Sequence, residues 1–466
     1  MSHYDPELVA IADYVLAGPT PSELALTTAH QTTFDALGCA MLALSFPECT
    51  KLLGPEVPGA DFAEGARVPG TPYRLTPVKA AFNLATMIRW LDFNDTWLAA
   101  EWGHPSDNLG GILMAADWYS RNHAPLPMAA VLNSLVRAHE IQGILALENS
   151  FNSVGLDHVL LVRVATAATV TALLGGNQEE VLSAVSNAFI DGGTLRTYRH
   201  APNTGSRKSW AAGDATARGV QLALWALAGE MGYPRALSAP NWGFYDALFR
   251  GERFQLPQPF ASYVMENVLF KVLYPAEFHA QTAVEAAMAL HPLVKDRWAE
   301  IERIEIETQA AGARVIDKQG PLNNPADRDH CIQYMVAVPL IFGRLTAQDY
   351  LDEISQDPRI DALRAKMTVR ENPLFTQAYF DPDRRAIPNS VQVFFEDGSH
   401  TERVQVDYPL GHRFRRQEAL PFLLAKLEKN LASRFPAKRV GRIMALAQNP
   451  EQVLAISVPE FVENWL

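Results

Sequence analysis

The chain has 466 residues, of which 48% are hydrophobic and 20% charged, and its formal net charge is −12. This composition is typical of a globular protein with two or three domains. The acidic balance and the absence of a long basic run argue against nucleic acid as a partner, and no run of about eighteen apolar residues predicts a membrane span.

The N-terminus and the cysteines predict where the protein works. The first seven residues lack the basic-then-apolar order of a secretory signal. Three cysteines, Cys39, Cys49 and Cys331, have neither paired metal-ligand spacing nor the density of a disulfide scaffold. We therefore expect a cytoplasmic protein whose cysteines serve packing.

Helical periodicity dominates the chain from about residue 6 to residue 264. Apolar residues recur every three or four positions in five clear stretches, namely 24–44, 128–147, 158–174, 178–189 and 213–227. Loops rich in Gly, Pro and Asn interrupt them, and no repeat of fixed period occurs. This half of the chain is expected to form a helical bundle.

Polar chemistry is most concentrated in the stretch 90–108, between two expected helices. Thr76 and Pro77 predict the start of the first helix, which places Asp92 near its end. Ser106 and Asp107 suit the cap of the second helix, and His104 lies just before them. The stretch is either an ordinary capped loop or a site whose packing holds these side chains still and excludes water.

Two further polar positions interrupt the helical half. His158 opens the expected helix 158–174, where a histidine either packs as a neutral ring or points into a cleft. Lys208 follows Arg207 in a glycine-containing turn that could hold an anion, although solvated basic loops are commoner. The glycine order of a nucleotide-binding loop is missing.

The pattern changes after about residue 267. A helix over 275–291 precedes β-branched strands near 301–306, 367–370, 391–395 and 404–406, which predict a small antiparallel sheet around a helix over 328–342. Lys271, at this change, either extends to water or supplies charge inside a cleft. Tyr334 is either a buried ring or a site hydroxyl. Helical periodicity returns from Gln417 onward.

In combination, four of these segments resemble the MmgE/PrpD family, and the resemblance covers nearly the whole chain. The segments that carry it are DFNDTW at 92–97, GHPSDN at 103–108, YPAEFHAQTAVEA at 274–286 and DRDHCIQY at 327–334. The resemblance implies a mostly α fold with an α+β part. A large all-helical domain (1–266 and 408–466) would carry a smaller α+β lid domain (267–407), inserted before the C-terminal helices, and the chain would form a homodimer.

The resemblance also implies a site and an activity. The activity is that of a carbon–oxygen lyase, which removes water from 2-methylcitrate to give 2-methyl-cis-aconitate in propionate breakdown, with citrate and cis-aconitate as further possible substrates. The implied roles are catalytic for Asp92, His104, His158 and Lys271, and substrate-binding for Thr96, Lys208, His279 and Tyr334.

Elimination of water needs a base for the C–H proton, cations for the charge that grows on the adjacent carboxylate, and an acid for the leaving hydroxyl. The carboxylate, imidazole and lysine side chains named above can supply these, and the residue types leave open which is acid and which is base. The cysteine spacing predicts no iron–sulfur cluster, no metal and no cofactor. The family also contains cis-aconitate decarboxylases, but the longer spacer between Thr96 and His104 favours the dehydratase, and a sensor of anionic metabolites is the non-enzymatic alternative.

Overall fold

The computed structural model of the protein describes residues 4–466 and divides them into two compact units. The helical unit comprises residues 4–203, 207–269 and 423–466, and the mixed unit comprises 204–206 and 270–422. The predicted fold class, mostly α with a smaller α+β part, is confirmed.

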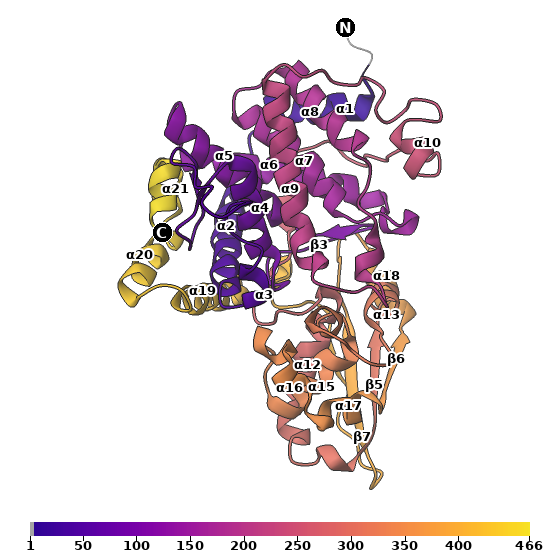
Figure 1. Ribbon diagram of the computed structural model, residues 1–466. Coiled ribbons are helices and arrows are strands. Elements are labelled where there is room, and N and C mark those ends of the chain that lie inside the picture. Colours follow the sequence, from indigo (N-terminus) through magenta and orange to yellow (C-terminus); the bar gives the residue numbers. More distant parts are fainter. Residues whose placement is uncertain (1–3) are drawn as a thin grey trace. The chain divides into compact units, whose positions relative to one another are not determined.

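The helical unit is a bundle whose long helices pack against several others (Figure 1). Its helices within residues 4–269 are α1 Pro6–Ala17, α2 Glu23–Ala43, α3 Pro47–Thr50, α4 Pro77–Arg89, α5 Leu109–Asn122, α6 Met128–Glu148, α7 Val159–Leu173, α8 Gln178–Ile190, α9 Arg207–Leu227, α10 Phe244–Leu248 and α11 Tyr263–Asn267. The five helices predicted from periodicity are all confirmed within a few residues, apart from α9, which begins six residues earlier than expected.

Helix α7 is the centre of this bundle and packs against α6, α8 and α9. Its residues from Val159 to Thr171 are all buried, as expected for a helix that is apolar on every side. None of the helices between residues 4 and 466 combines the length and hydrophobicity that a bilayer-spanning helix requires. The apolar helices of this bundle therefore cover one another.

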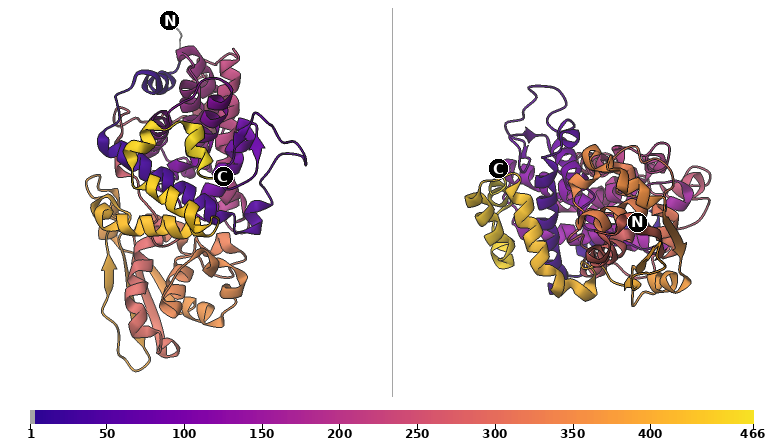
Figure 2. Two further views of the ribbon diagram at one scale, coloured as in Figure 1. Left: turned by 90° about the vertical axis from the view of Figure 1, so that its left-hand side faces the viewer. Right: turned by 90° about the horizontal axis from the view of Figure 1, so that it is seen from below.

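The end of the chain completes the helical unit. Helices α20 Ala437–Ala447, α21 Pro450–Ala455 and α22 Val458–Glu463 follow α19 Arg416–Ala432, which crosses from one unit to the other, and the yellow ribbons lie beside the indigo α2 (Figures 1 and 2). His30 Nε2 bonds the Ala447 carbonyl at 2.8 Å, and Lys426 Nζ lies 2.7 Å from Asp35 Oδ1. These buried polar contacts fix the C-terminal helices on α2.

The mixed unit contains a four-stranded sheet in the order β6-β5-β7-β8. The strands are β5 Ile301–Thr308, β6 Met367–Glu371, β7 Asn389–Phe395 and β8 Val404–Val406. All four lie where the sequence predicted them, but the prediction of an antiparallel sheet is wrong for one pair, because β6 runs parallel to β5. The chain between β5 and β6 contains helices, and a crossover of that kind makes parallel pairing possible.

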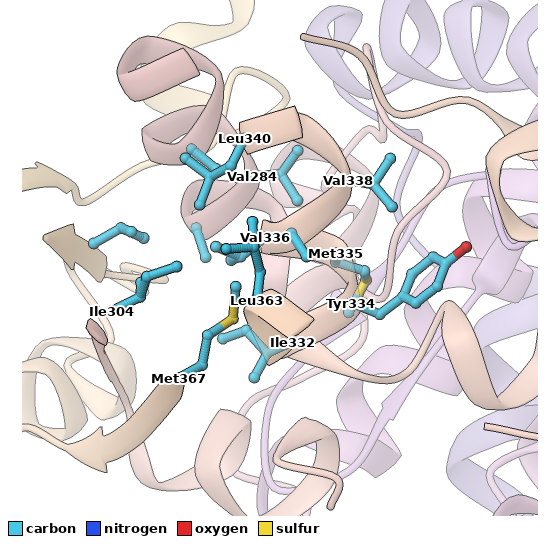
Figure 3. Packing of buried hydrophobic residues seen from close by; sticks show 14 of the residues in the cluster. Val284, Ile304, Ile332, Tyr334, Met335, Val336, Val338, Leu340, Leu363 and Met367 are labelled. Carbon is cyan, nitrogen blue, oxygen red and sulfur yellow. The ribbon is translucent and has the colours of Figure 1, made fainter. Parts of the chain in front are cut away.

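Helices α12 Gln281–Val294, α15 Ile332–Phe342 and α17 Pro358–Arg364 pack together with this sheet. Figure 3 shows their shared core, in which Val284, Ile304 and Leu363 come from three different elements. The helix predicted over 328–342 is in fact two, since α14 Pro325–Arg328 ends before α15 begins. The smaller elements of this unit are α13 Ala310–Ile316, α16 Asp352–Ser355 and α18 Pro373–Phe380.

Candidate active site

The stretch 90–108 forms a buried loop of the helical unit, between the end of α4 and the start of α5. Its two short strands, β3 Trp97–Leu98 and β4 Trp102–Gly103, pair as a hairpin. Thr96 exchanges backbone hydrogen bonds of 2.8 and 2.9 Å with Leu269, which ties the hairpin to the end of α11. A loop held on both sides in this way keeps its polar side chains in fixed positions.

Asp92 is the most constrained residue of the loop. It lies in the left-handed region with φ of 50°, which a non-glycine residue adopts only at a cost in free energy. Its carboxylate accepts a 2.9 Å bond from Arg89 Nη1, and both side chains are buried. A strained backbone and a buried ion pair together aim this carboxylate in one direction.

His104 meets Asp92 across the loop. Its Nδ1 lies 2.6 Å from the Asp95 carbonyl oxygen, and because that oxygen can only accept, Nδ1 carries a proton. Nε2 faces Asp92 Oδ1 at 3.5 Å, and Thr96 Oγ1 lies 3.3 Å from Nδ1. In its neutral form this ring presents the Nε2 lone pair, and Asp92 stabilises the imidazolium that forms when Nε2 takes a proton.

Asp95 supports the loop through its side chain. Its Oδ2 lies 2.8 Å from Nε2 of His139, and its Oδ1 accepts from the Ser106 amide at 3.1 Å. The predicted capping role of Ser106 and Asp107 is wrong: a 3₁₀ turn, Pro105–Asn108, precedes α5, and both side chains accept from Asn94 instead. Burial raises the pKa of Asp107 to about 8, so that carboxyl is largely neutral at physiological pH.

His158 lies immediately before the first residue of α7, where a helix start was predicted, and its ring centroid lies 5.9 Å from that of His104. The side chain is buried, and neither ring nitrogen makes a hydrogen bond within the described chain. Burial, reinforced by the charges of Arg199 and Arg196, lowers the pKa of this imidazole well below its ordinary value, against the opposing pull of Asp157. His158 is therefore a neutral ring, close to His104, whose nitrogens are available to a ligand.

Lys208 lies in the first turn of α9 and is buried, with only 2% of its surface exposed. A solvated basic loop, which was the commoner alternative, is therefore wrong for this residue. Its neighbour Arg207 is the exposed cation, which lies over Trp210 and pairs with Asp214. Of the two adjacent cations, Lys208 is the one that is buried, as expected of a residue that lines a site.

In the mixed unit, Lys271 is also buried, with 1% exposed, so the alternative in which this lysine extends to water is wrong. Burial alone would raise the pKa of Glu277, but the bond to His279 and the charges of His330 and Lys271 outweigh burial and lower it. Glu277 is thus ionised and contributes negative charge to the surroundings of the Lys271 ammonium group.

His279 and Tyr334 both have partners inside the mixed unit. His279 Nδ1 lies 2.8 Å from Glu277 Oε1, and its Nε2 lies 3.2 Å from the Tyr379 hydroxyl. Tyr334 is a buried ring stacked on Tyr350, and its hydroxyl donates to the Asp349 carbonyl at 2.5 Å. Figure 3 shows that hydroxyl at the edge of the apolar cluster, directed away from the other labelled side chains.

Residues 9–257 match the MmgE/PrpD N-terminal domain, and residues 274–452 match the MmgE/PrpD C-terminal domain. The chain belongs to the MmgE/PrpD family. It is 58% identical to the 2-methylcitrate dehydratase of Escherichia coli strain K12, with 99% of this chain and 98% of that protein covered. It is 59% identical to the 2-methylcitrate dehydratase of Cupriavidus necator (99% and 97% covered) and 53% identical to the mitochondrial 2-methylcitrate dehydratase of Yarrowia lipolytica (98% and 89% covered).

The helical unit of this MmgE/PrpD protein brings together Asp92, Thr96, His104 and His158, which are among the residues predicted for the site. Sequence reasoning missed the charged residues behind them, namely Arg89, His139, Asp157, Arg196 and Arg199. Only one of these left a signal along the chain: Arg89 and Asp92 have the i, i+3 spacing of a helical ion pair. The others come from separate elements, and only the fold shows that they meet.

Proposed function

We propose that this MmgE/PrpD protein is a 2-methylcitrate dehydratase, which converts 2-methylcitrate into 2-methyl-cis-aconitate and water in propionate breakdown by the methylcitrate cycle. Relatives that carry this name are 53–59% identical to it over nearly its full length. The observation that carries the proposal is the buried His104, whose Nδ1 is committed to a carbonyl and whose Nε2 faces Asp92. That geometry suits proton transfer at carbon.

In the proposed reaction, Nε2 of His104 takes the proton from the carbon beside a substrate carboxylate. The electron pair of that C–H bond forms the new double bond, and the adjacent C–O bond breaks. The His104 imidazolium then gives its proton to the leaving hydroxide, which forms water and restores the neutral ring. Asp92 stabilises the imidazolium, and His158 contacts the substrate as a neutral ring. This assignment makes His104 the base.

The negative charge that grows on the substrate carboxylate needs cations in surroundings that exclude water. In our proposal the buried Lys208 and Lys271 supply them, and Thr96 orients an oxygen of the tricarboxylate. Lys271, His279 and Tyr334 enter the proposal from the family resemblance alone. Because both nitrogens of His279 and the hydroxyl of Tyr334 already have protein partners, we propose that these two residues act mainly by orienting their neighbours.

We further propose that the reaction needs no metal and no cofactor. Iron–sulfur clusters are held by several converging thiolates. The chain has three cysteines, all buried, and burial raises the pKa of Cys49 to about 12 and that of Cys331 as well, which keeps both as thiols. Turnover should therefore survive aerobic handling and chelation; a loss that iron restores would refute this part.

A homodimer and a cytoplasmic location also belong to the proposal, the first from the family resemblance and the second from the cysteine content. The alternative activity is decarboxylation of cis-aconitate, and the non-enzymatic alternative is a sensor of anionic metabolites. One experiment separates all three. Metal-depleted protein is incubated with separate 2-methylcitrate stereoisomers, citrate and cis-aconitate, and the products are identified by mass.

Loss of water from a 2-methylcitrate isomer is the expected result. Loss of carbon dioxide from cis-aconitate would assign the decarboxylase instead. Binding of these compounds without any turnover would favour the sensor.

A further inference from the structure

The carboxylate next to His158 is held by arginines that no part of the proposed reaction uses. Asp157 Oδ2 accepts from Arg199 Nε, and Oδ1 accepts from Arg199 Nη2 at 3.1 Å and from the Val159 amide at 3.2 Å. Arg196 Nη1 lies 3.8 Å from Oδ2. Asp157 is thereby committed to a bidentate guanidinium pair, the strongest hydrogen-bonded form of a carboxylate.

Against this, the contact of Asp157 with His158 is weak. His158 Nδ1 lies 3.4 Å from Asp157 Oδ1 but makes no hydrogen bond within the described residues. A buried carboxylate at this distance would ordinarily draw a proton onto the imidazole. The arginines oppose that pull, because their positive charges neutralise the carboxylate and repel an imidazolium.

We propose that Arg199 is a positioning residue that binds Asp157 and thereby keeps His158 neutral, with a ring nitrogen available to the substrate. The benefit to the reaction rests on the proposed function, whereas the effect on the protonation of His158 does not. No sequence motif or relative's name assigns a role to Arg199.

Backbone hydrogen bonds fix the segments that carry Asp157 and Arg199. The Asp157 amide donates to the Thr194 carbonyl at 2.7 Å, and the Arg196 amide donates to the Gly155 carbonyl at 2.9 Å. These bonds fasten the 3₁₀ turn Arg196–Arg199 to the start of α7. Arg199 therefore reaches Asp157 from a fixed position, and little side-chain freedom is lost when the pair forms.

The surroundings of His158 agree with this role. The charged or titratable groups that act on it are Asp157 beside it, Arg199 and Arg196 from the 3₁₀ turn, Arg89 from α4, and His104. Three of these are permanent cations, so the net field favours the neutral ring, and burial acts in the same direction by lowering the pKa of His158. Arg199 is the cation bonded directly to the opposing carboxylate.

The test is a histidine-selective NMR titration of the full-length protein, with the His158 signal assigned by its loss in His158→Gln. In the wild type the His158 signal should stay that of a neutral imidazole throughout the pH range in which histidines ordinarily titrate and the protein is folded. In Arg199→Met the midpoint should rise by about one to three pH units, the usual effect of an unmasked neighbouring charge. Arg163→Met is the control, since Arg163 is a buried arginine of α7 that bonds the Ala188 carbonyl instead of Asp157.

Two further variants complete the test. Arg199→Met with Asp157→Asn removes both charges and should return His158 to the neutral form. If Arg199→Met does not fold, Arg196→Met should move the midpoint upward by less, because its guanidinium is farther from Asp157. An unchanged midpoint in whichever of the two arginine variants folds would overturn the proposal and leave a purely structural ion pair.

The pH dependence of catalytic activity provides an independent test of the role of Arg199. With 2-methylcitrate, Arg199→Met should lose kcat/KM at acidic pH and recover it at alkaline pH, whereas a merely structural defect would lower kcat/KM by one factor at every pH. If the wild type does not turn over 2-methylcitrate, the proposed function fails while the NMR titration still tests Arg199.

Discussion

The two buried histidines of the helical unit lie with their ring centroids 5.9 Å apart but in opposite electrostatic surroundings. His104 donates from Nδ1 to a carbonyl and faces Asp92, whose ion pair with Arg89 leaves the carboxylate 3.5 Å from Nε2. His158 faces a carboxylate that Arg199 holds in a bidentate pair, and neither of its nitrogens is hydrogen-bonded. In our proposal His104 gains a proton during the reaction and His158 stays without one.

A neighbouring carboxylate does not by itself determine whether a buried histidine takes up a proton. Both histidines have an aspartate within 3.5 Å, and both aspartates bind an arginine. His158, however, is surrounded by three arginines and makes no hydrogen bond through which Asp157 could stabilise a proton. Two rings of the same type can therefore take different parts in one elimination reaction.

The largest expected effect comes from removing the proton-accepting ring. His104→Gln should lower turnover of 2-methylcitrate by roughly two to four orders of magnitude, the usual contribution of a positioned acid or base. Substrate affinity and melting temperature should change much less. Single-turnover rates, binding and thermal melting on the same preparation measure all three.

The matched control for this variant is His30→Gln. His30 is a buried histidine of the same unit, and its Nε2 bonds the Ala447 carbonyl. Its loss should destabilise the fold and leave the chemical step unchanged. If His104→Gln behaved in the same way, His104 would be a packing residue.

In the proposed reaction His104 accepts the proton and His158 stays neutral, and the lysines stabilise the growing negative charge. Lys271→Met should fold and lose roughly two to three orders of magnitude in kcat, as expected when one electrostatic contact to a growing negative charge is removed. Lys366→Met, which removes a partly buried lysine of the mixed unit that bonds the Ile301 carbonyl, is the control. Near-normal kcat/KM in Lys271→Met would take this lysine out of the mechanism.

A smaller effect is expected from a substitution that disturbs the spacing of the two rings and leaves both histidines in the sequence. A Cβ atom at Gly103 would lie 2.8 Å from Gln142 Nε2 and 3.3 Å from His158 Cδ2. Gly103→Ala should therefore displace the His158 ring and lower turnover by roughly ten- to a hundredfold, since misplacement by about an ångström has effects of that size. Gly441→Ala, at a helical glycine with open space around it, should leave turnover unchanged.

The sequence predicted the helical bundle, the four strands and most of the candidate site, because periodicity and turn residues are local signals. It could not predict that β6 pairs in parallel with β5, since strand order depends on how the intervening helices pack. For the same reason no local sequence pattern indicates that Asp157 pairs with Arg199. Composition alone favours lysines that reach water, so only the family resemblance pointed to site roles for Lys208 and Lys271, both of which are buried.

The smallest predicted effect is on the free energy of unfolding. It compares the arginine-bound carboxylates of the site with Asp107, which has no arginine partner in the described part of the chain. Burial raises the pKa of Asp107 to about 8, so the folded state keeps a proton that the unfolded state loses near pH 4. Stability should therefore fall as the pH rises from about 4 to 8, by on the order of a few kcal/mol, and then level off.

Asp107→Asn tests this, because asparagine has no proton to lose. The melting temperature of the variant relative to the wild type should rise between pH 5 and pH 8. Asp61→Asn, which alters an exposed aspartate, should show no such trend. A constant difference between Asp107→Asn and the wild type would mean that Asp107 is already ionised when folded.

The measurement that tests the central claim most directly is the tautomer of His104 in the wild-type protein. Long-range ¹⁵N–¹H spectra of histidine-labelled protein, assigned with His104→Gln, report which ring nitrogen carries the proton when the ring is neutral. The 2.6 Å contact with the Asp95 carbonyl predicts a proton on Nδ1 and a lone pair on Nε2, on the side of Asp92. A neutral ring protonated on Nε2 would contradict the account, because His104 could then not accept the substrate proton.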